Sequence, residues 1–271
     1  MAPLTECYYP PLHAIDCLEA NQGDVMKMYH ALAALTFSLC VSISPANADE
    51  LRLTASEWRP YVDAHVQRSG FAVALVSRAL ERAGYDVSID IGPWPQTLED
   101  TITGKHDIFA TLWFTDERAK SLVFSEPYIE NEIVFVRRSD SGIHFRERKD
   151  LLGLRIGIVD DFAYSSESVD TADIEIVSSG SVTDNVAQLR NGELDLVLTD
   201  RRVALAEINR RALAKSFDVL PDPLITRGLR IGVSKERDDA DAIVAAFEDE
   251  IAKMREDGSF NAILATFRVT N

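Results

Sequence analysis

Three side chains of this 271-residue chain are suited to binding a zwitterion. The guanidinium of Arg118 can hold a carboxylate through two parallel hydrogen bonds, which a lysine cannot reproduce. Asp200 offers a carboxylate that could receive an ammonium group, and Trp58 could cover an apolar or cationic side chain. Each residue also has an ordinary structural explanation, namely a surface arginine, a helix N-cap aspartate and a packing tryptophan. Taken singly, the three residues therefore leave both explanations open.

All three residues come shortly after a segment that has the pattern of a β-strand. The three segments are residues 51–55, 108–112 and 194–198. In open α/β sheets, ligands bind beyond the carboxyl ends of the strands. The sequence therefore predicts that Trp58, Arg118 and Asp200 lie at ligand-binding edges.

Strand and helix patterns alternate along the chain in two series, which predicts parallel βαβ units. The first series ends with the apolar run 133–136, and the second begins with a predicted strand at 155–159 after a polar stretch. The predicted helices are 71–83, 98–102, 182–189, 203–214 and 240–255. The pattern indicates an α/β protein with two lobes, each a sheet flanked by helices.

Residues 1–48 have the three parts of a secretion signal. A basic segment begins at Met26, an uncharged apolar run covers 31–43, and Ala46–Ala48 supplies the small residues that signal peptidase requires. We expect cleavage after Ala48. The part before the basic segment looks like an extension from a mis-assigned start codon, so Met1, Met26 and Met28 all remain candidate start sites.

The composition excludes several other classes of function. The net charge of −16 repels nucleic acid and anionic lipid, so neither is expected as a partner. Cys7, Cys17 and Cys40 all precede the predicted cleavage site, which leaves the mature chain without disulfides or cysteine-bound zinc. The histidines lack the spacing of metal ligands and no glycine-rich phosphate loop follows a strand, so no cofactor is expected.

An ordered series of short motifs carries a family resemblance from about residue 51 to 267. Its members include Glu57–Tyr61, Gly104–Asp107, Thr115–Lys120, Phe124–Tyr128, Gly192–Asp195 and Asp257–Phe260. The series resembles the bacterial extracellular solute-binding proteins of family 3, the polar amino-acid receptors of ABC importers. The resemblance implies a monomeric periplasmic protein that closes over a small polar solute, an amino acid in most of the family, and delivers it to an inner-membrane permease.

The resemblance also implies a type II-like periplasmic-binding-protein fold with two hinge strands. Lobe one would comprise residues 49–129 plus 228–271, and lobe two residues 133–223. The hinges would lie near 130–132 and 224–227.

By the same resemblance, Arg118 would hold the α-carboxylate and Asp200 the α-amino group. Trp58 would line the side-chain pocket, and Thr111 would meet the ligand through its backbone or hydroxyl. The chain departs from the family at two places. Trp113 stands where a small hydroxyl residue is usual. Phe162 lies in a loop that usually carries Gly-Thr or Gly-Ser. Both are bulky enough to reshape the pocket, so a small polar solute is a firmer expectation than an α-amino acid.

Two other functions remain open at this point. Some relatives of this fold are dehydratases that act on cyclic amino-acid precursors such as arogenate, and Glu57, His65, Asp160 and Asp161 could supply a general acid or base here. The chain could instead be the ligand receptor of a membrane sensor kinase, whose lobes would look alike. We expect a binding protein rather than an enzyme, because exposed loop carboxylates are usually only solvated.

Overall fold

The computed structural model describes residues 50–159 and 174–267. The predicted signal peptide and Phe162 lie outside the described residues. None of the helices in the described ranges is long and apolar enough to cross a membrane.

The described strands form one hydrogen-bonded sheet in the order β2-β1-β3-β10-β5-β8-β6-β7, with β4 paired to β10 and β9 paired to β5. The strands are β1 (Glu50–Ala55), β2 (Asp86–Ile91), β3 (Ile108–Trp113), β4 (Leu122–Phe124), β5 (Ile129–Arg138), β6 (Arg155–Val159), β7 (Glu175–Ser179), β8 (Leu196–Asp200), β9 (Phe217–Val219) and β10 (Ile225–Ser234). The predicted apolar run 133–136 is thus the centre of the longer strand β5.

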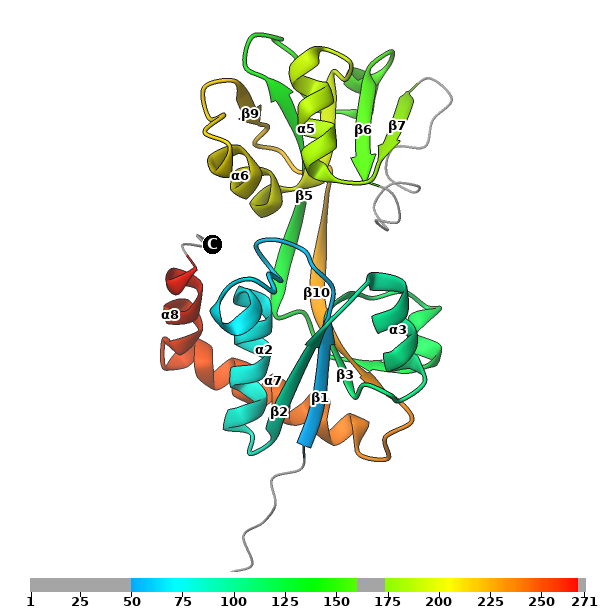
Figure 1. Ribbon diagram of the computed structural model, residues 1–271, viewed down its shortest axis with the longest axis vertical. Coiled ribbons are helices and arrows are strands. Elements are labelled where there is room, and N and C mark those ends of the chain that lie inside the picture. The colour runs from blue at the N-terminus through cyan, green and yellow to red at the C-terminus, as the bar shows by residue number, and fades with distance from the viewer. Residues whose placement is uncertain (1–49, 160–173, 268–271) are drawn as a thin grey trace, which may run out of the picture. The chain divides into compact units, whose positions relative to one another are not determined.

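Helices connect the strands within each series (Figure 1). The α-helices are α2 (Phe71–Arg82), α3 (Trp94–Ile102), α5 (Val182–Asn191), α6 (Arg201–Arg210), α7 (Ala240–Glu256) and α8 (Ser259–Thr266). Short 3₁₀ turns occur at η1 (Gln67–Ser69), η2 (Arg118–Lys120) and η3 (Arg148–Leu151). Helix α6 begins two residues before its predicted start and ends four residues before its predicted end. It begins early because Asp200 caps it, and it is followed by Ala212, which has a positive φ of 54°.

The elements fall into two groups with the same strand order, which is the two-lobed α/β fold. Lobe one contains β1–β4, α2, α3, α7 and α8, and lobe two contains β6–β9, α5 and α6. In lobe one, β1 pairs in parallel with β2 and β3, and β10 is antiparallel to β3. In lobe two, β6 pairs in parallel with β7 and β8, and β5 is antiparallel to β8. Each lobe is therefore a parallel three-strand unit with one antiparallel strand beside it.

Strands β5 and β10 take part in both lobes. They pair antiparallel with each other, Ile129 lying opposite Leu229 and Ile133 opposite Ile225, and Figure 1 shows them side by side. The first part of β5 and the second part of β10 belong with lobe one, while the rest of β5 pairs with β8 and β9. The lobe and hinge boundaries given above remain predictions.

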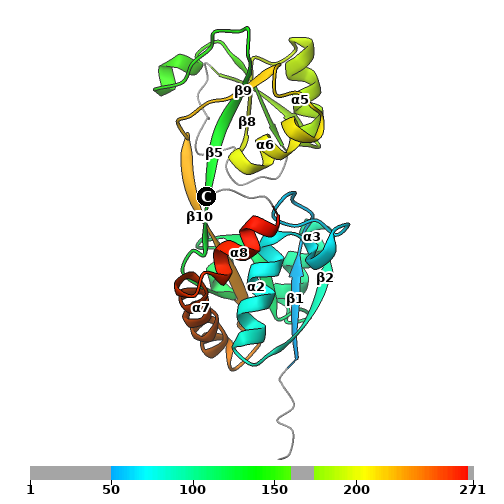
Figure 2. The same ribbon diagram turned by 90° about the vertical axis from the view of Figure 1, so that its left-hand side faces the viewer.

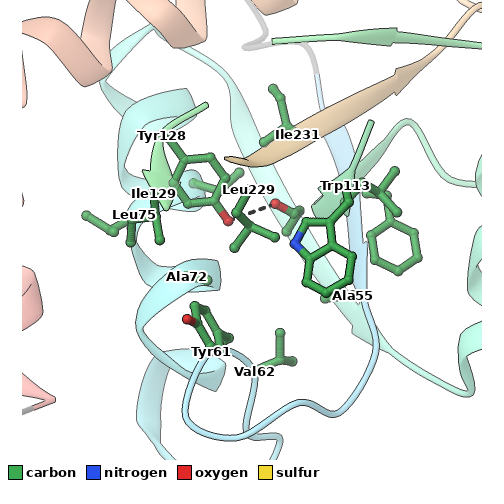
Figure 3. Close-up of a cluster of buried hydrophobic side chains, with 14 of the residues drawn as sticks. Ala55, Tyr61, Val62, Ala72, Leu75, Trp113, Tyr128, Ile129, Leu229 and Ile231 are labelled. Carbon is green, nitrogen blue, oxygen red and sulfur yellow. Dashed lines mark hydrogen bonds between the residues drawn. The ribbon is translucent and has the colours of Figure 1, made fainter. Parts of the chain in front are cut away.

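Apolar runs place the central strands in the core, as parallel strands covered on both faces require. All six residues of β3 and all five of β8 are buried. Helix α2 has nine buried residues and packs against α7 and α8, as the second view shows (Figure 2). Figure 3 shows part of the lobe-one core, where Leu75 of α2 and Leu229 of β10 lie near Tyr128.

A clasp between a strand arginine and an aspartate fixes the start of β3. The backbone N–H of Arg52 and its Nε both donate to Asp107 Oδ2, at 2.8 and 2.9 Å. Its Nη2 donates to Asp107 Oδ1 and to the carbonyl of Gly104, both at 2.9 Å. The backbone N–H of Asp107 also donates to the Arg52 carbonyl, at 2.9 Å. Lobe one therefore fixes β3 against β1 by charge-assisted hydrogen bonds.

A second clasp with the same connections fixes the start of β8 in lobe two. The backbone N–H and Nε of Arg155 donate to Asp195 Oδ2, at 2.9 and 3.0 Å. Its Nη2 donates to Asp195 Oδ1 at 3.0 Å and to the carbonyl of Gly192 at 2.8 Å. The Asp195 N–H donates to the Arg155 carbonyl at 2.9 Å. The two glycine-containing motifs noted in the sequence thus serve the same purpose in the two lobes.

Candidate functional site

An aromatic cluster lies beyond the carboxyl end of β1. The chain after β1 folds back on itself through a bridge between Trp58 and Val62, whose backbone hydrogen bonds are 3.0 and 2.9 Å long. The fold-back stacks the Trp58 ring on Tyr61, with centroids 4.3 Å apart and an interplanar angle of 17°. Trp113, at the end of β3, meets Trp58 edge to face at 6.0 Å. Two of the predicted site residues, Trp58 and Trp113, are therefore in direct contact.

Trp113 also joins the two strands that the lobes share. Its Nε1 donates to the side-chain oxygen of Asn131 on β5 at 2.8 Å. The guanidinium of Arg227 on β10 lies 5.6 Å from the centre of its ring, within the range of a cation–π contact. Asn131 and Arg227 lie opposite each other in the β5–β10 register. Trp113 thus contacts one residue on each of the two shared strands.

Arg118 is a half-buried cation without a carboxylate partner in the described part of the chain. It begins the turn η2, where its N–H donates to the Thr115 hydroxyl at 3.2 Å. Its Nη1 donates to the Trp113 carbonyl at 2.9 Å, and its guanidinium lies 5.0 Å from the ring centre of Trp94. Burial lowers the pKa of this guanidinium, although arginine remains protonated at neutral pH. A carbonyl and a ring leave most of its N–H donors available to an anion.

Thr111 precedes Trp113 by two residues on β3, so both side chains lie on the same face of the sheet. The side chain is buried. It makes no hydrogen bond to any residue in 50–159 or 174–267, which leaves its hydroxyl able to bond a ligand.

Asp200 ends β8 and caps helix α6. Its Oδ1 accepts hydrogen bonds from the N–H groups of Arg202 and Val203, at 2.8 and 3.1 Å. These are two of the N–H groups that a helix leaves without a partner at its N-terminus. The structural explanation considered for this aspartate, a helix N-cap, is therefore confirmed.

The second carboxylate oxygen of Asp200 is also occupied. Its Oδ2 accepts from the Tyr61 hydroxyl at 2.9 Å and from the Asn131 amide nitrogen at 3.1 Å. The residue is only 1% exposed. Burial raises the pKa of Asp200, and the hydrogen bonds from Val203 and Asn131 oppose that shift. A continuous chain of hydrogen bonds thus runs from Trp113 through Asn131 to Asp200.

Arg202 adds a second guanidinium beside this chain of hydrogen bonds. Its Nη1 lies 3.3 Å from the Tyr61 hydroxyl and donates to the Glu130 carbonyl at 2.8 Å. No ion pair joins Arg202 to a carboxylate in the described ranges.

The structure brings most of the sequence-predicted residues together. Trp58, Trp113 and Arg118 are linked by ring contacts and a hydrogen bond, with Thr111 on the same strand face as Trp113. Asp200 joins them only through Tyr61 and Asn131, and Phe162 lies outside the described residues. Among residues 50–159 and 174–267, no group of three or more His, Cys, Asp or Glu side chains could hold a metal ion.

Sequence reasoning missed the residues that connect the site, namely Tyr61, Asn131, Arg202 and Arg227. Tyr61 stood in a quoted motif, two positions after Arg59 and directly after Pro60, but nothing in the motif indicated its contact with Asp200. Asn131 is a fully buried amide within a strand. In the alternating pattern of the strand, Asn131 shares a face with Ile129 and Ile133. A polar residue on an otherwise apolar face is a signal that could have identified it, since buried amides need partners.

A family model matches residues 53–269, and its family is described as the bacterial extracellular solute-binding proteins, family 3. The "Probable histidine-binding protein" of Neisseria gonorrhoeae is 27% identical over 252 residues, covering 88% of this chain and 92% of that protein. The "ABC transporter arginine-binding protein 1" of Escherichia coli K12 is 24% identical, covering 86% of this chain and 95% of that protein.

Solved structures share the fold. An ancestral arginine-binding protein bound to arginine superposes with a TM-score of 0.67 at 20% identity, covering 82% of this chain and 99% of that one. At this level of identity the likeness establishes the two-lobed fold.

Proposed function

Because this chain belongs to the bacterial extracellular solute-binding proteins of family 3, we propose that it is the solute-binding component of an ABC importer and captures a small polar solute that bears a carboxylate. The chain is a binding protein rather than an enzyme, as its family is. The observation that supports a carboxylate on the solute is the environment of Arg118. This guanidinium is half-buried, lies close to two tryptophans, and has no carboxylate partner in residues 50–159 and 174–267.

The solute would bind first to lobe one, against Arg118, Thr111 and Trp58. Lobe two would then close by bending near residues 130–132 and 224–227. Trp113 supports this coupling because it contacts Asn131 on one shared strand and Arg227 on the other. Closure would exclude water from the site and strengthen its charge-assisted hydrogen bonds.

The proposed importer role also implies a location and a partner. Residues 1–48 would direct export to the periplasm and be removed after Ala48, and the monomer would then deliver solute to an inner-membrane permease. The intact mass of the protein recovered from the periplasm tests the export step. The expected mass is that of a chain that begins at Asp49. A larger mass, from a chain that keeps residues before Asp49, would contradict the predicted cleavage.

The amino-acid class predicted from the sequence is supported by the names of the curated relatives, which are histidine- and arginine-binding proteins. In this chain, Arg118 supports a carboxylate on the solute directly. The first experiment uses residues 49–271, freed of bound solute by unfolding and refolding. A thermal-shift and calorimetric screen then covers amino acids, amines and organic acids. Stabilisation that rises with concentration of a carboxylate is the expected result.

The decisive variant is Arg118→Ala. Its affinity for the identified solute should fall by about 2–5 kcal/mol, because the bound carboxylate loses its partner in a desolvated site. Arg190→Ala is a matched control, since Arg190 is an exposed arginine of α5 with no ion pair in the described residues. Equal affinity in the two variants would refute the carboxylate assignment.

A further inference from the structure

Asp200 has no acceptor site left for a ligand. An ionised carboxylate offers about four lone-pair directions. Two backbone N–H groups of helix α6 occupy Oδ1, and the Tyr61 hydroxyl and Asn131 amide occupy Oδ2. The side chain is also closed to solvent, at 1% exposure. An ammonium group could reach Asp200 only by displacing one of these four donors.

Neither of the two side-chain donors is easily displaced. The Tyr61 ring is fully buried, stacks on Trp58 and contacts Phe71 at 4.8 Å between centroids. Asn131 is also fully buried, and its oxygen already accepts the Trp113 N–H. Moving either side chain would leave a buried polar group without a partner, which costs more than the lost hydrogen bond itself.

Guanidinium groups also contact the aromatic cluster beside Asp200. Arg202 Nη1 lies 3.3 Å from the Tyr61 hydroxyl, and the Arg227 guanidinium lies over the Trp113 ring. Arg118 contacts the carbonyl of the same tryptophan. Three guanidinium groups thus contact the aromatic cluster, and the buried carboxylate that the described residues place beside it, that of Asp200, is fully hydrogen-bonded. Positive charge beside the cluster disfavours a cationic group there and favours an anionic one.

From this arrangement we infer that the solute is an organic carboxylate without an α-ammonium group, and that Tyr61 is the residue that determines this specificity. The inference rests on the proposed function, because it concerns the same Arg118 site. The Tyr61 hydroxyl takes the place on Asp200 that an ammonium group would need. The solute's carboxylate then binds Arg118, and its remaining carbon skeleton lies against Trp58 and Trp113.

The test compares amino acids with their deaminated analogues. Each L-amino acid is paired with the carboxylic acid that has the same skeleton but a hydrogen in place of the α-ammonium group. Dissociation constants are measured by calorimetry on refolded residues 49–271. The expected result is that the deaminated acid binds at least about tenfold tighter in the best-binding pair, a difference of about 1.4 kcal/mol.

Two tyrosine variants show whether Tyr61 is responsible. Tyr61→Phe keeps the stacked ring and frees one acceptor site on Asp200, so the preference should shift toward the amino acid by about tenfold, or about 1.4 kcal/mol. Tyr128→Phe is the matched control, because Tyr128 is equally buried and its hydroxyl donates to the Ala110 carbonyl instead. Its preference should equal that of the wild type. Circular dichroism and the unfolding temperature establish that both variants are folded.

The outcomes separate the two proposals. If wild-type protein binds an amino acid tighter than its deaminated analogue, or if Tyr61→Phe leaves the preference unchanged in folded protein, the inference is overturned while the carboxylate site stands. If no member of any pair binds, the carboxylate site itself is refuted and both proposals fall.

Discussion

Lobes one and two carry the same clasp at the start of their third parallel strand. Arg52 with Asp107 and Arg155 with Asp195 share every hydrogen bond, from the backbone N–H to the Nη2 contact with the glycine carbonyl three residues before the aspartate. The clasps differ in their surroundings. The Asp107 side chain is 2% exposed and also receives Arg237 at 3.3 Å, whereas the Asp195 side chain is 21% exposed. The aspartate of the lobe-one clasp is therefore more buried and has one more arginine partner than the aspartate of the lobe-two clasp.

The opposite ends of the same two strands differ in chemistry. Beyond β3, Arg118 is a cation without a counter-ion in the described residues. Beyond β8, Asp200 is an anion whose acceptor sites are all filled by the protein. Equivalent strands thus end in a group that can bind a ligand in lobe one and in a structural cap in lobe two. The comparison suggests that lobe one holds the solute and lobe two mainly closes over it.

Removal of the clasp carboxylates should distinguish the lobes most strongly. Asp107→Ala leaves Arg52 and Arg237 beside an empty buried site and should lower the free energy of unfolding by about 3–5 kcal/mol. Asp195→Ala removes a carboxylate that is already 21% exposed, so it should cost less, about 1–3 kcal/mol. Urea unfolding of both variants measures the difference. Equal losses would show that burial of the lobe-one clasp has no energetic consequence.

Acid should weaken both clasps, though less than removal of either side chain, because a protonated aspartate keeps some of its hydrogen bonds. Burial of Asp107 opposes ionisation, but its hydrogen bonds from Arg52 outweigh burial and lower its pKa. The hydrogen bond from Arg155 lowers the pKa of Asp195. Both folded-state values lie below the unfolded value of about 3.9, so the stabilisation is complete above that pH. It is lost as the pH falls through the folded-state values.

The pH dependence can be assigned to the clasps by comparison with amide variants. The free energy of unfolding of the wild type should fall steadily below about pH 4, the unfolded aspartate range. Asp107→Asn and Asp195→Asn should each show a shallower fall. If both variants keep the wild-type slope, acid acts on other carboxylates, such as Asp257, whose hydrogen bonds with Ser259 and Arg82 lower its pKa to about 2.

The smallest difference is expected at the two clasp glycines. Gly104 and Gly192 both have positive φ values, 75° and 79°. At Gly192 an added Cβ would meet no atom within 4 Å, so Gly192→Ala should cost only the backbone strain of about 1 kcal/mol. At Gly104 the Cβ would lie 2.8 Å from Cβ of Glu236, which should add about 1 kcal/mol of crowding. Thermal unfolding of the two variants checks this, and a larger loss at Gly192 would contradict it.

The order of most of the longer elements could be predicted because it depends on local patterns, whereas β4, β7, β9 and α8 were not predicted. Alternating residues marked β1 and β2, and Gly84 marked the end of α2. The start of α6 was predicted too late, because Asp200 both ends β8 and caps the helix without an intervening loop. A pattern search assigns a residue to one element and so misses such a double role.

The site was predicted in part for a similar reason. Arg118 and Trp58 are candidates because of their chemistry and their positions after strands, and their contact with a solute stays a prediction. The contacts of Asp200 with Tyr61 and Asn131 join residues 139 and 69 positions apart, and no spacing rule indicates them. The two clasps could not be predicted from the sequence either, since the arginine and aspartate of each clasp are 55 and 40 positions apart. The two motifs share a glycine and, three residues later, an aspartate, but neither motif indicates which arginine binds it.

Strand β10 has a consequence for the order in which the two lobes can be completed as the chain emerges N-terminus first. It is the antiparallel partner of β3, yet it comes after every strand of lobe two in the sequence. The first three strands to emerge therefore cannot complete their sheet until residues 225–234 have followed. Strands β5 to β9 have by then all emerged and can pair with one another. The lobe that emerges first is the last to be completed, which reverses the usual N-terminal-first order of domain folding.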